Sequence, residues 1–220
     1  MSRPTTTVFD LDGTLIESRG DIAAALNHAL ESSGRPRQPD EVVATYVGSG
    51  ARTLCARALR LPDEAPEVSA LLAAFLAYYI AHPVVRTTWL PGALEALDAL
   101  EGVTKLALCT NKSREVTDAV LRGLGVTHRF VAVVAGNDLP ERKPHPSTLQ
   151  RVADLAGVPL EGLLMVGDSP IDIACAKRAG IPSVGVFGGF ATDDEVREAE
   201  PDHLLVTLHE LPALVRRLCS

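Results

Sequence analysis

Two acidic residues directly follow a short apolar run near the start of the chain. The run is Thr6–Phe9, and Asp10 and Asp12 come next, before a glycine that permits a tight turn. In an extended chain, residues two apart point the same way, so both carboxylates project from the end of one strand. Carboxylates this close repel each other unless a cation or a shared proton intervenes. With Mg²⁺ between them, one carboxylate could attack phosphorus while the other handles protons.

An Asp-x-Asp pair also has simpler interpretations. It is common in ordinary turns and helix caps, and it occurs in calcium-binding loops. A calcium loop is disfavoured here because its glycine belongs at position six, whereas Gly13 stands at position four. None of these alternatives explains why an apolar strand should end in two acids.

A second apolar run, residues 163–166, also ends in an acid, Asp168. Its carboxylate could complete an oxygen-rich Mg²⁺ site with Asp10. The following residues have another explanation, because Ser169, Pro170 and Asp172 are typical of a helix start. We assign Ser169 to the helix cap, and for Asp172 both a cap role and a site role stay open.

Two weaker patterns contain groups that could bind an anion. Thr110 and Asn111 follow the run Lys105–Cys109 and precede a helical stretch, so a hydroxyl and free backbone N–H groups could receive phosphate there. Lys143, one of four lysines, lies beside prolines that stiffen its segment, and its ammonium could offset phosphate charge and hold Asp10. Ordinary turn chemistry and a solvated loop are the alternatives.

The segments that carry these residues alternate between apolar runs and helical patterns. This order is typical of βαβ units, and near-continuous apolar runs are typical of strands covered on both faces. Because ligands bind at the carboxyl ends of such strands, the acids should meet at one edge of the sheet. The fold class we predict is α/β, with a doubly wound, Rossmann-like parallel sheet. Its strands should occupy residues 6–9, 105–109, 131–134, 163–166 and 183–187.

The rhythm changes between the first and second predicted strands, where only helical patterns occur. One helical face carries Ile22, Leu26, Ala29 and Leu30, and a second carries Val68, Leu71, Leu72, Phe75 and Tyr79. We therefore predict a helical cap over residues 17–84, inserted into a core formed by residues 1–16 and 85–220.

Composition and charge disfavour several classes of protein. The chain has 220 residues, is 46% hydrophobic and 22% charged, and carries a net charge of −7, which disfavours nucleic-acid binding. The four cysteines form no C-x-x-C pair, which is typical of a reducing cytosol. No secretory signal is recognisable, and the longest apolar run, 12 residues, is too short to cross a bilayer. A cytoplasmic protein with no membrane association is expected, as a monomer or a homodimer.

Four segments, in their order along the chain, resemble the motifs of the haloacid dehalogenase superfamily of phosphohydrolases. The helical insertion after the first motif resembles the subfamily with a type-1 cap, and nearly the whole chain resembles bacterial phosphoglycolate phosphatases. The matching stretches are Phe9-Asp10-Leu11-Asp12-Gly13-Thr14-Leu15, Val47-Gly48-Ser49-Gly50, Thr110-Asn111-Lys112, Lys143-Pro144-His145-Pro146 and Val166-Gly167-Asp168-Ser169.

The resemblance implies a Mg²⁺-dependent phosphatase acting on a small phosphorylated metabolite, with phosphoglycolate the nearest example. Asp10 would be the nucleophile that forms an aspartyl-phosphate, and Asp12 the acid and base. Mg²⁺ would be held by Asp10, the Asp12 backbone carbonyl and Asp168.

The resemblance also implies which residues surround this centre. Thr110, Asn111 and Lys143 would receive the phosphoryl oxygens, and Asp172 would steady the metal's waters or Lys143. In the cap, Gly48 or Arg52 could contact a substrate carboxylate, although a plain turn with a solvated arginine explains that segment equally well.

Related chemistries fit less well. Dehalogenases of the superfamily lack the second acid, which is present here as Asp12. Phosphonoacetaldehyde hydrolases and β-phosphoglucomutases use a cap lysine, whereas the first lysine of this chain is Lys105, so a phosphomutase is disfavoured. A non-catalytic phospho-metabolite sensor should have lost Asp12 or Lys143, and both are present. A pyrophosphatase or a nucleotide or sugar-phosphate phosphatase remains the alternative.

Overall fold

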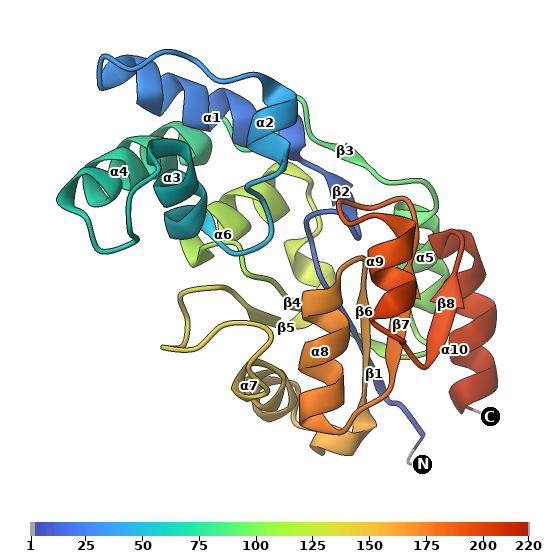
Figure 1. The fold of residues 1–220 in the computed structure, drawn as a ribbon. Helices are drawn as coiled ribbons and strands as arrows, with labels where there is room; N and C mark the ends of the chain where they lie inside the picture. The colour runs from blue at the N-terminus through green and yellow to red at the C-terminus, as the bar shows by residue number, and fades with distance from the viewer. Residues whose placement is uncertain (1–2, 220) are drawn as a thin grey trace. The chain divides into compact units, whose positions relative to one another are not determined.

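The computed structural model of the chain describes residues 3–219. They form two compact units (Figure 1). One unit comprises the chain up to residue 17, residues 89–110 and the chain from residue 128 onward. The other comprises residues 18–88 and 111–127. We call them the α/β unit and the helical unit.

A six-stranded sheet forms the centre of the α/β unit. Its strand order is β5-β4-β1-β6-β7-β8, and every neighbouring pair is parallel. This confirms the predicted fold class and places the first strand near the middle of the sheet. The strands are β1 Thr6–Phe9, β4 Lys105–Cys109, β5 Phe130–Val134, β6 Leu163–Gly167, β7 Ser183–Val186 and β8 His203–Leu205. The edge strand β8 was not predicted, because it is three residues long and buries only Leu205 fully.

Helices cover both faces of this sheet, as expected for strands without a polar face. On one face α7 packs against β4 and β5, and α8 packs against β6, β7 and α7. Ala107 and Cys109 of β4 belong to that buried cluster, so the alternating Leu106 and Leu108 face the opposite side. There α5 packs against β4 and α10. The helices of this unit are α5 Ala93–Leu100, α7 Ser147–Ala156, α8 Pro170–Ala179, α9 Asp193–Glu198 and α10 Leu211–Cys219.

The helical unit is built around a pair of helices, α1 and α4, which pack against each other over much of their length. The predicted faces are buried on both helices, except that Leu72 is only half-buried. The helix α6, which follows Thr110 in the chain, also packs against α4 and belongs to this unit. The helices are α1 Arg19–Ser32, α2 Asp40–Ala44, α3 Ala51–Leu59, α4 Pro66–Ala81 and α6 Arg114–Gly123.

A buried carboxylate joins the first helix of this unit to the segment that ends the insertion. Asp21, in the first turn of α1, accepts hydrogen bonds from the backbone N–H groups of Val85, Arg86 and Thr87, at 2.9 to 3.1 Å. The Thr87 hydroxyl donates a further bond of 2.7 Å. Nearby in the chain, β2 Ile16–Glu17 and β3 Thr88–Trp89 form a separate two-stranded sheet. The beginning and the end of the insertion are therefore joined both by the hydrogen bonds of Asp21 and by the small sheet of β2 and β3.

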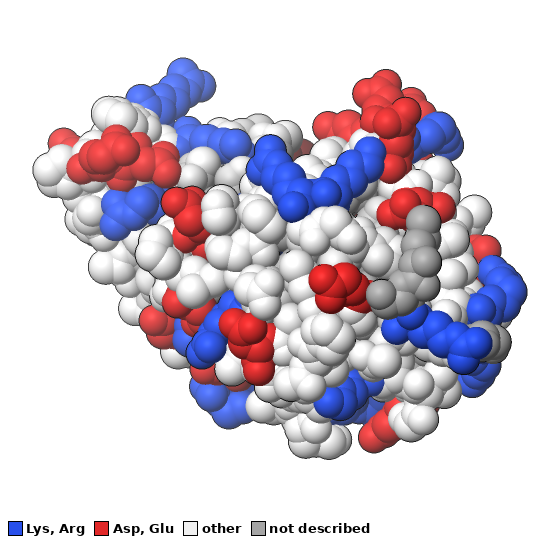
Figure 2. Space-filling model, turned by 90° about the horizontal axis from the view of Figure 1, so that it is seen from below, with Lys and Arg blue, Asp and Glu red and all other residues white. Residues whose placement is uncertain are grey.

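The described residues also show the hydropathy of the helices, the surface charge and the state of the cysteines. Within residues 3–219 no helix combines the length and apolarity needed to span a membrane. On the face in Figure 2, Lys and Arg side chains are interspersed with Asp and Glu. Among the described residues the four cysteines are free, and three of them are buried.

Candidate active site

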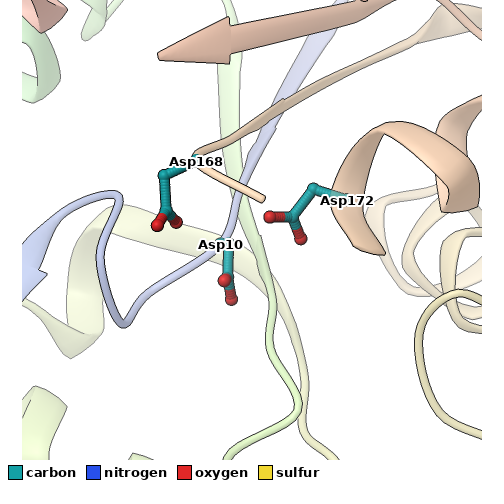
Figure 3. A group of neighbouring side chains, drawn as sticks. All are labelled: Asp10, Asp168 and Asp172. Carbon is teal, nitrogen blue, oxygen red and sulfur yellow. The ribbon is translucent and has the colours of Figure 1, made fainter. Parts of the chain in front are cut away.

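Three carboxylates gather at the carboxyl edge of the central strands. Phe9 at the end of β1 pairs with Leu108 of β4 and Val166 of β6, so the residues after these three strands emerge side by side. Asp10 follows β1, Asp168 follows β6, and Asp172 lies in the first turn of α8 (Figure 3). Each offers a carboxylate oxygen, and the three oxygens lie within 4.8 Å of one another. The sheet thus brings Asp10 and Asp168 together across 158 residues of sequence, as the strand pattern predicted.

Lys143 lies between two of these acids. Its Nζ is 2.8 Å from Asp10 Oδ1 and 2.7 Å from Asp172 Oδ1, and its side chain is 2% exposed. Burial lowers the pKa of Lys143, but the carboxylates of Asp10 and Asp172 together outweigh burial and raise the pKa above its ordinary value. Lys143 therefore carries a permanent positive charge at the site.

Asp172 contacts both the start of α8 and the Lys143 ammonium. Its Oδ1 accepts from Lys143, while its Oδ2 accepts from the backbone N–H of Ser169 at 3.2 Å and from the Ser169 hydroxyl at 2.6 Å. It caps α8 and orients the lysine with the same carboxylate.

Asp168 is almost completely buried and is held by two donors. The Thr14 hydroxyl donates to Oδ1 and the backbone N–H of Phe190 donates to Oδ2, each at 2.7 Å. Gly13 has a φ of +86°, and a Cβ there would lie 2.4 Å from Asp168 Oδ2, so both backbone conformation and space require glycine. The turn after Asp10 can therefore approach Asp168 closely.

Burial raises the pKa values of both candidate ligands. The pKa of Asp10 rises to about 7, because burial and the charges of Asp172 and Asp168 outweigh the attraction of Lys143. The pKa of Asp168 rises to about 6 for the same main reason, burial, with Asp172 adding to it. Both carboxyls therefore hold a proton more tightly than an exposed aspartate does.

A divalent cation fits this group of residues. Three carboxylates at −1 and one ammonium at +1 leave a formal charge of −2 in a buried position. Asp10 and Asp168 offer hard oxygen ligands, which suit Mg²⁺ or a similar cation. Asp12 is half-buried in the turn after β1, and its proposed backbone ligand role stays a prediction.

The remaining predicted residues lie in two places. Thr110 is buried at the end of β4, where its N–H donates to Val134 O at 2.9 Å. Asn111 and Gly48 lie together in the helical unit, where Asn111 Nδ2 donates to Gly48 O at 3.1 Å. Arg52 Nη1 donates to the Asp63 carbonyl at 2.9 Å and contacts the Ser69 hydroxyl at 3.2 Å. In the structure its guanidinium is thus engaged by neighbours of its own unit.

Sequence reasoning missed two contributors to this geometry, Thr14 and Phe190, and one contact within the helical unit, that of Lys112. Thr14 belongs to the first motif, but no role follows from its type alone. Phe190 acts through a backbone N–H, which every residue except proline carries, so its side chain gives no signal. Lys112 is buried with its Nζ 4.6 Å from the centre of the Tyr79 ring in the helical unit, a contact that needs the packing of α4 to be known.

A family model described as "Haloacid dehalogenase-like hydrolase" matches residues 7–186 of the chain. A phosphoglycolate phosphatase from Rhodospirillum rubrum is 40% identical over 199 residues, covering 86% of this chain and 82% of that protein. A phosphoglycolate phosphatase from Agrobacterium fabrum is 37% identical over 219 residues, covering 97% and 93%. Among solved structures, a predicted phosphoglycolate phosphatase from Haemophilus somnus superposes with a TM-score of 0.86 at 28% identity, covering 97% of this chain and 99% of that one.

Proposed function

The chain belongs to the haloacid dehalogenase-like hydrolase family, and from this premise we propose that it is a Mg²⁺-dependent phosphatase of small phosphorylated metabolites. One observation carries the proposal. The carboxylate oxygens of Asp10 and Asp168 lie within 4.8 Å of each other, and Lys143 Nζ is 2.8 Å from Asp10. A buried site with excess negative charge is suited to a divalent cation and, through it, to a phosphate group.

Asp10 is the proposed nucleophile. Its carboxylate oxygen bonds to phosphorus while the ester P–O bond breaks, which gives an aspartyl-phosphate and a leaving alkoxide. Lys143 holds Asp10 in place and opposes the effect of burial on it, because a fixed ammonium beside a carboxylate favours the ionised, attacking form. When Mg²⁺ is bound by Asp10, Asp168 and the Asp12 carbonyl, it neutralises charge on the phosphate.

Asp12 is proposed to move protons on either side of this step. It protonates the leaving alkoxide and then takes a proton from the water that attacks phosphorus and frees Asp10. A carboxyl two residues from the nucleophile lies on the same side of the extended chain, within reach of the leaving group. Thr110 and Asn111, which follow β4, are the proposed donors to the phosphoryl oxygens.

Phosphoglycolate is the substrate we propose, in keeping with the names of the 37–40% identical relatives. The cap, residues 17–84, is proposed to select it, with Gly48 and Arg52 as contacts for the carboxylate. Arg52 would have to release Asp63 and Ser69 to serve in this way. Pyrophosphate, nucleotides and sugar phosphates are the competing substrates. A cytoplasmic location is proposed as well, in keeping with the free cysteines.

The test is phosphate release from a panel of phosphorylated metabolites, with and without Mg²⁺. We expect activity on phosphoglycolate that chelation abolishes, and a loss of at least about a thousandfold in Asp10→Asn. The matched control is Asp138→Asn, which changes an acid in the loop after β5, outside the proposed chemistry. Undiminished turnover in a folded Asp10→Asn protein would overturn the proposed nucleophile. Preference for another phosphate ester would leave the chemistry standing and replace the substrate.

A further inference from the structure

Asp168 is held from two sides by segments that are far apart in the sequence. Thr14, in the turn after β1, donates to Oδ1, and the N–H of Phe190, in the loop after β7, donates to Oδ2. Both bonds are 2.7 Å long, and Asp168 is 1% exposed, so water does not compete for these positions. Hydrogen bonds of this length to a buried carboxylate fix its orientation.

The approach of the loop after β7 depends on a missing side chain. A Cβ on Gly189 would lie 2.3 Å from Asp168 Cβ and 2.4 Å from Asp168 Oδ2, closer than any real contact. Gly189 does not have a left-handed φ, so it is space rather than backbone conformation that requires glycine there. Its neighbour Gly188 is the reverse case, with a φ of +77° and no atom within 4 Å of the Cβ position. Of these two neighbouring glycines, it is Gly189 that lets the loop after β7 reach the carboxylate.

We propose that Gly189 and Phe190 are positioning residues for the divalent cation, acting through the Asp168 carboxylate. The inference rests on the proposed function, because it assumes that Asp168 binds the metal. Mg²⁺ accepts little departure from ideal octahedral geometry, so a ligand that can rotate or shift binds it less tightly. The Phe190 N–H sets the rotation of Asp168, and the bare backbone at Gly189 sets its distance from the loop. Loss of such an outer partner typically costs 10–100-fold in metal affinity.

Two substitutions test separately the space at Gly189 and the hydrogen bond from the Phe190 N–H. Gly189→Ala adds the excluded Cβ, and Phe190→Pro deletes the N–H. Each has a matched control: Gly188→Asn places a side chain on the neighbouring residue, where there is room and where asparagine tolerates a positive φ. Phe190→Ala removes the ring but keeps the N–H. Mg²⁺ affinity is measured by titration calorimetry on the metal-free proteins, and folding by circular dichroism.

We expect the Mg²⁺ dissociation constant to rise about 10–100-fold in Gly189→Ala and Phe190→Pro. It should change by less than about threefold in Gly188→Asn and Phe190→Ala. The Mg²⁺ concentration for half-maximal phosphatase rate should shift in parallel, while KM for the phosphate ester at saturating Mg²⁺ stays near that of the unmutated protein. A purely structural role for the loop would lower the melting temperature without this selective shift.

Replacing the backbone amide of residue 190 by an ester removes its N–H and leaves every side chain in place. This protein tests the proposal even if either substitution prevents folding. Unchanged Mg²⁺ affinity in folded Gly189→Ala, or in the ester protein, overturns this inference alone. Failure of the unmutated chain to bind Mg²⁺ overturns the proposed metal dependence and this inference together.

Discussion

At the scale of single residues, the site is a balance of buried charge. Lys143 contacts Asp10 and Asp172, and Asp172 in turn is fixed by Ser169, so one chain of contacts links Asp10, the proposed nucleophile, to the start of α8. Lys143 and Asp172 are buried and Asp10 is half-buried, so removing the lysine leaves the two carboxylates without compensation. Lys143, from a proline-rich segment, is therefore the residue that joins two of the three carboxylates of the site.

Substituting Lys143 should damage both stability and activity. In Lys143→Met the carboxylates of Asp10 and Asp172 lose their only ammonium partner in this group, which should lower the free energy of unfolding by about 3–5 kcal/mol. The phosphatase rate should fall at least about a hundredfold. Urea unfolding and phosphate release measure the two effects.

The control for this substitution is Lys105→Met, which removes an exposed lysine that donates to Ala156 O at 2.9 Å. It should cost no more than about 1 kcal/mol. Equal effects at the two positions would contradict the special role of Lys143.

The raised pKa values of Asp10 and Asp168 predict how stability depends on pH. In the metal-free protein these pKa values are about 7 and about 6, above those of the unfolded chain. Between about pH 4 and pH 7 the native state therefore binds more protons than the unfolded state, and this contribution to stability falls as the pH rises. Saturating Mg²⁺ should restore stability most at pH 7.

Calorimetric melting in EDTA, compared with Asp10→Asn, isolates this effect. The melting temperature of the unmutated protein should fall by several degrees relative to the variant between pH 4 and pH 7. Parallel curves for the two proteins would show that Asp10 does not titrate in this window and would refute the charge balance described here.

At the scale of elements, the parallel strands place the residues that follow them at one edge of the sheet. A buried carboxylate also joins the first helix of the insertion to its last segment. Asp21 in α1 accepts hydrogen bonds from three backbone N–H groups and from the Thr87 hydroxyl, all in the segment before β3. A carboxylate suits this position because it only accepts hydrogen bonds, and each of its partners is a donor.

Asp21→Asn should therefore lower the free energy of unfolding by about 2–3 kcal/mol, because its amide N–H₂ group would face donors. The matched control is Asp40→Asn. Asp40 also approaches Arg86, but through an exposed ion pair of 3.6 Å, so its loss should cost less than about 1 kcal/mol. Denaturant unfolding of the two variants compares them directly, and an equal loss in both would contradict the role given to Asp21.

At the scale of the whole molecule, the sequence predicted the sheet and its acidic edge because both follow from local patterns. Apolar runs ending in Asp10 and Asp168 specify strands whose carboxyl ends meet, wherever the intervening chain goes. What could not be predicted depends on packing across long separations. The Phe190 N–H and the cleared space at Gly189 have no residue-type signal, and the engagement of Arg52 by Asp63 requires the path of the helical unit to be known.

The proposed mechanism depends on covalent chemistry at Asp10, and trapping the intermediate tests it most directly. Acid quenching during turnover of phosphoglycolate, followed by peptide mass mapping, should find one phosphoryl group on Asp10. The modification should be absent in Asp10→Asn and in protein treated with EDTA. Accumulation of free phosphate with Asp10 never modified, or a phosphoryl group on another residue, would contradict the mechanism.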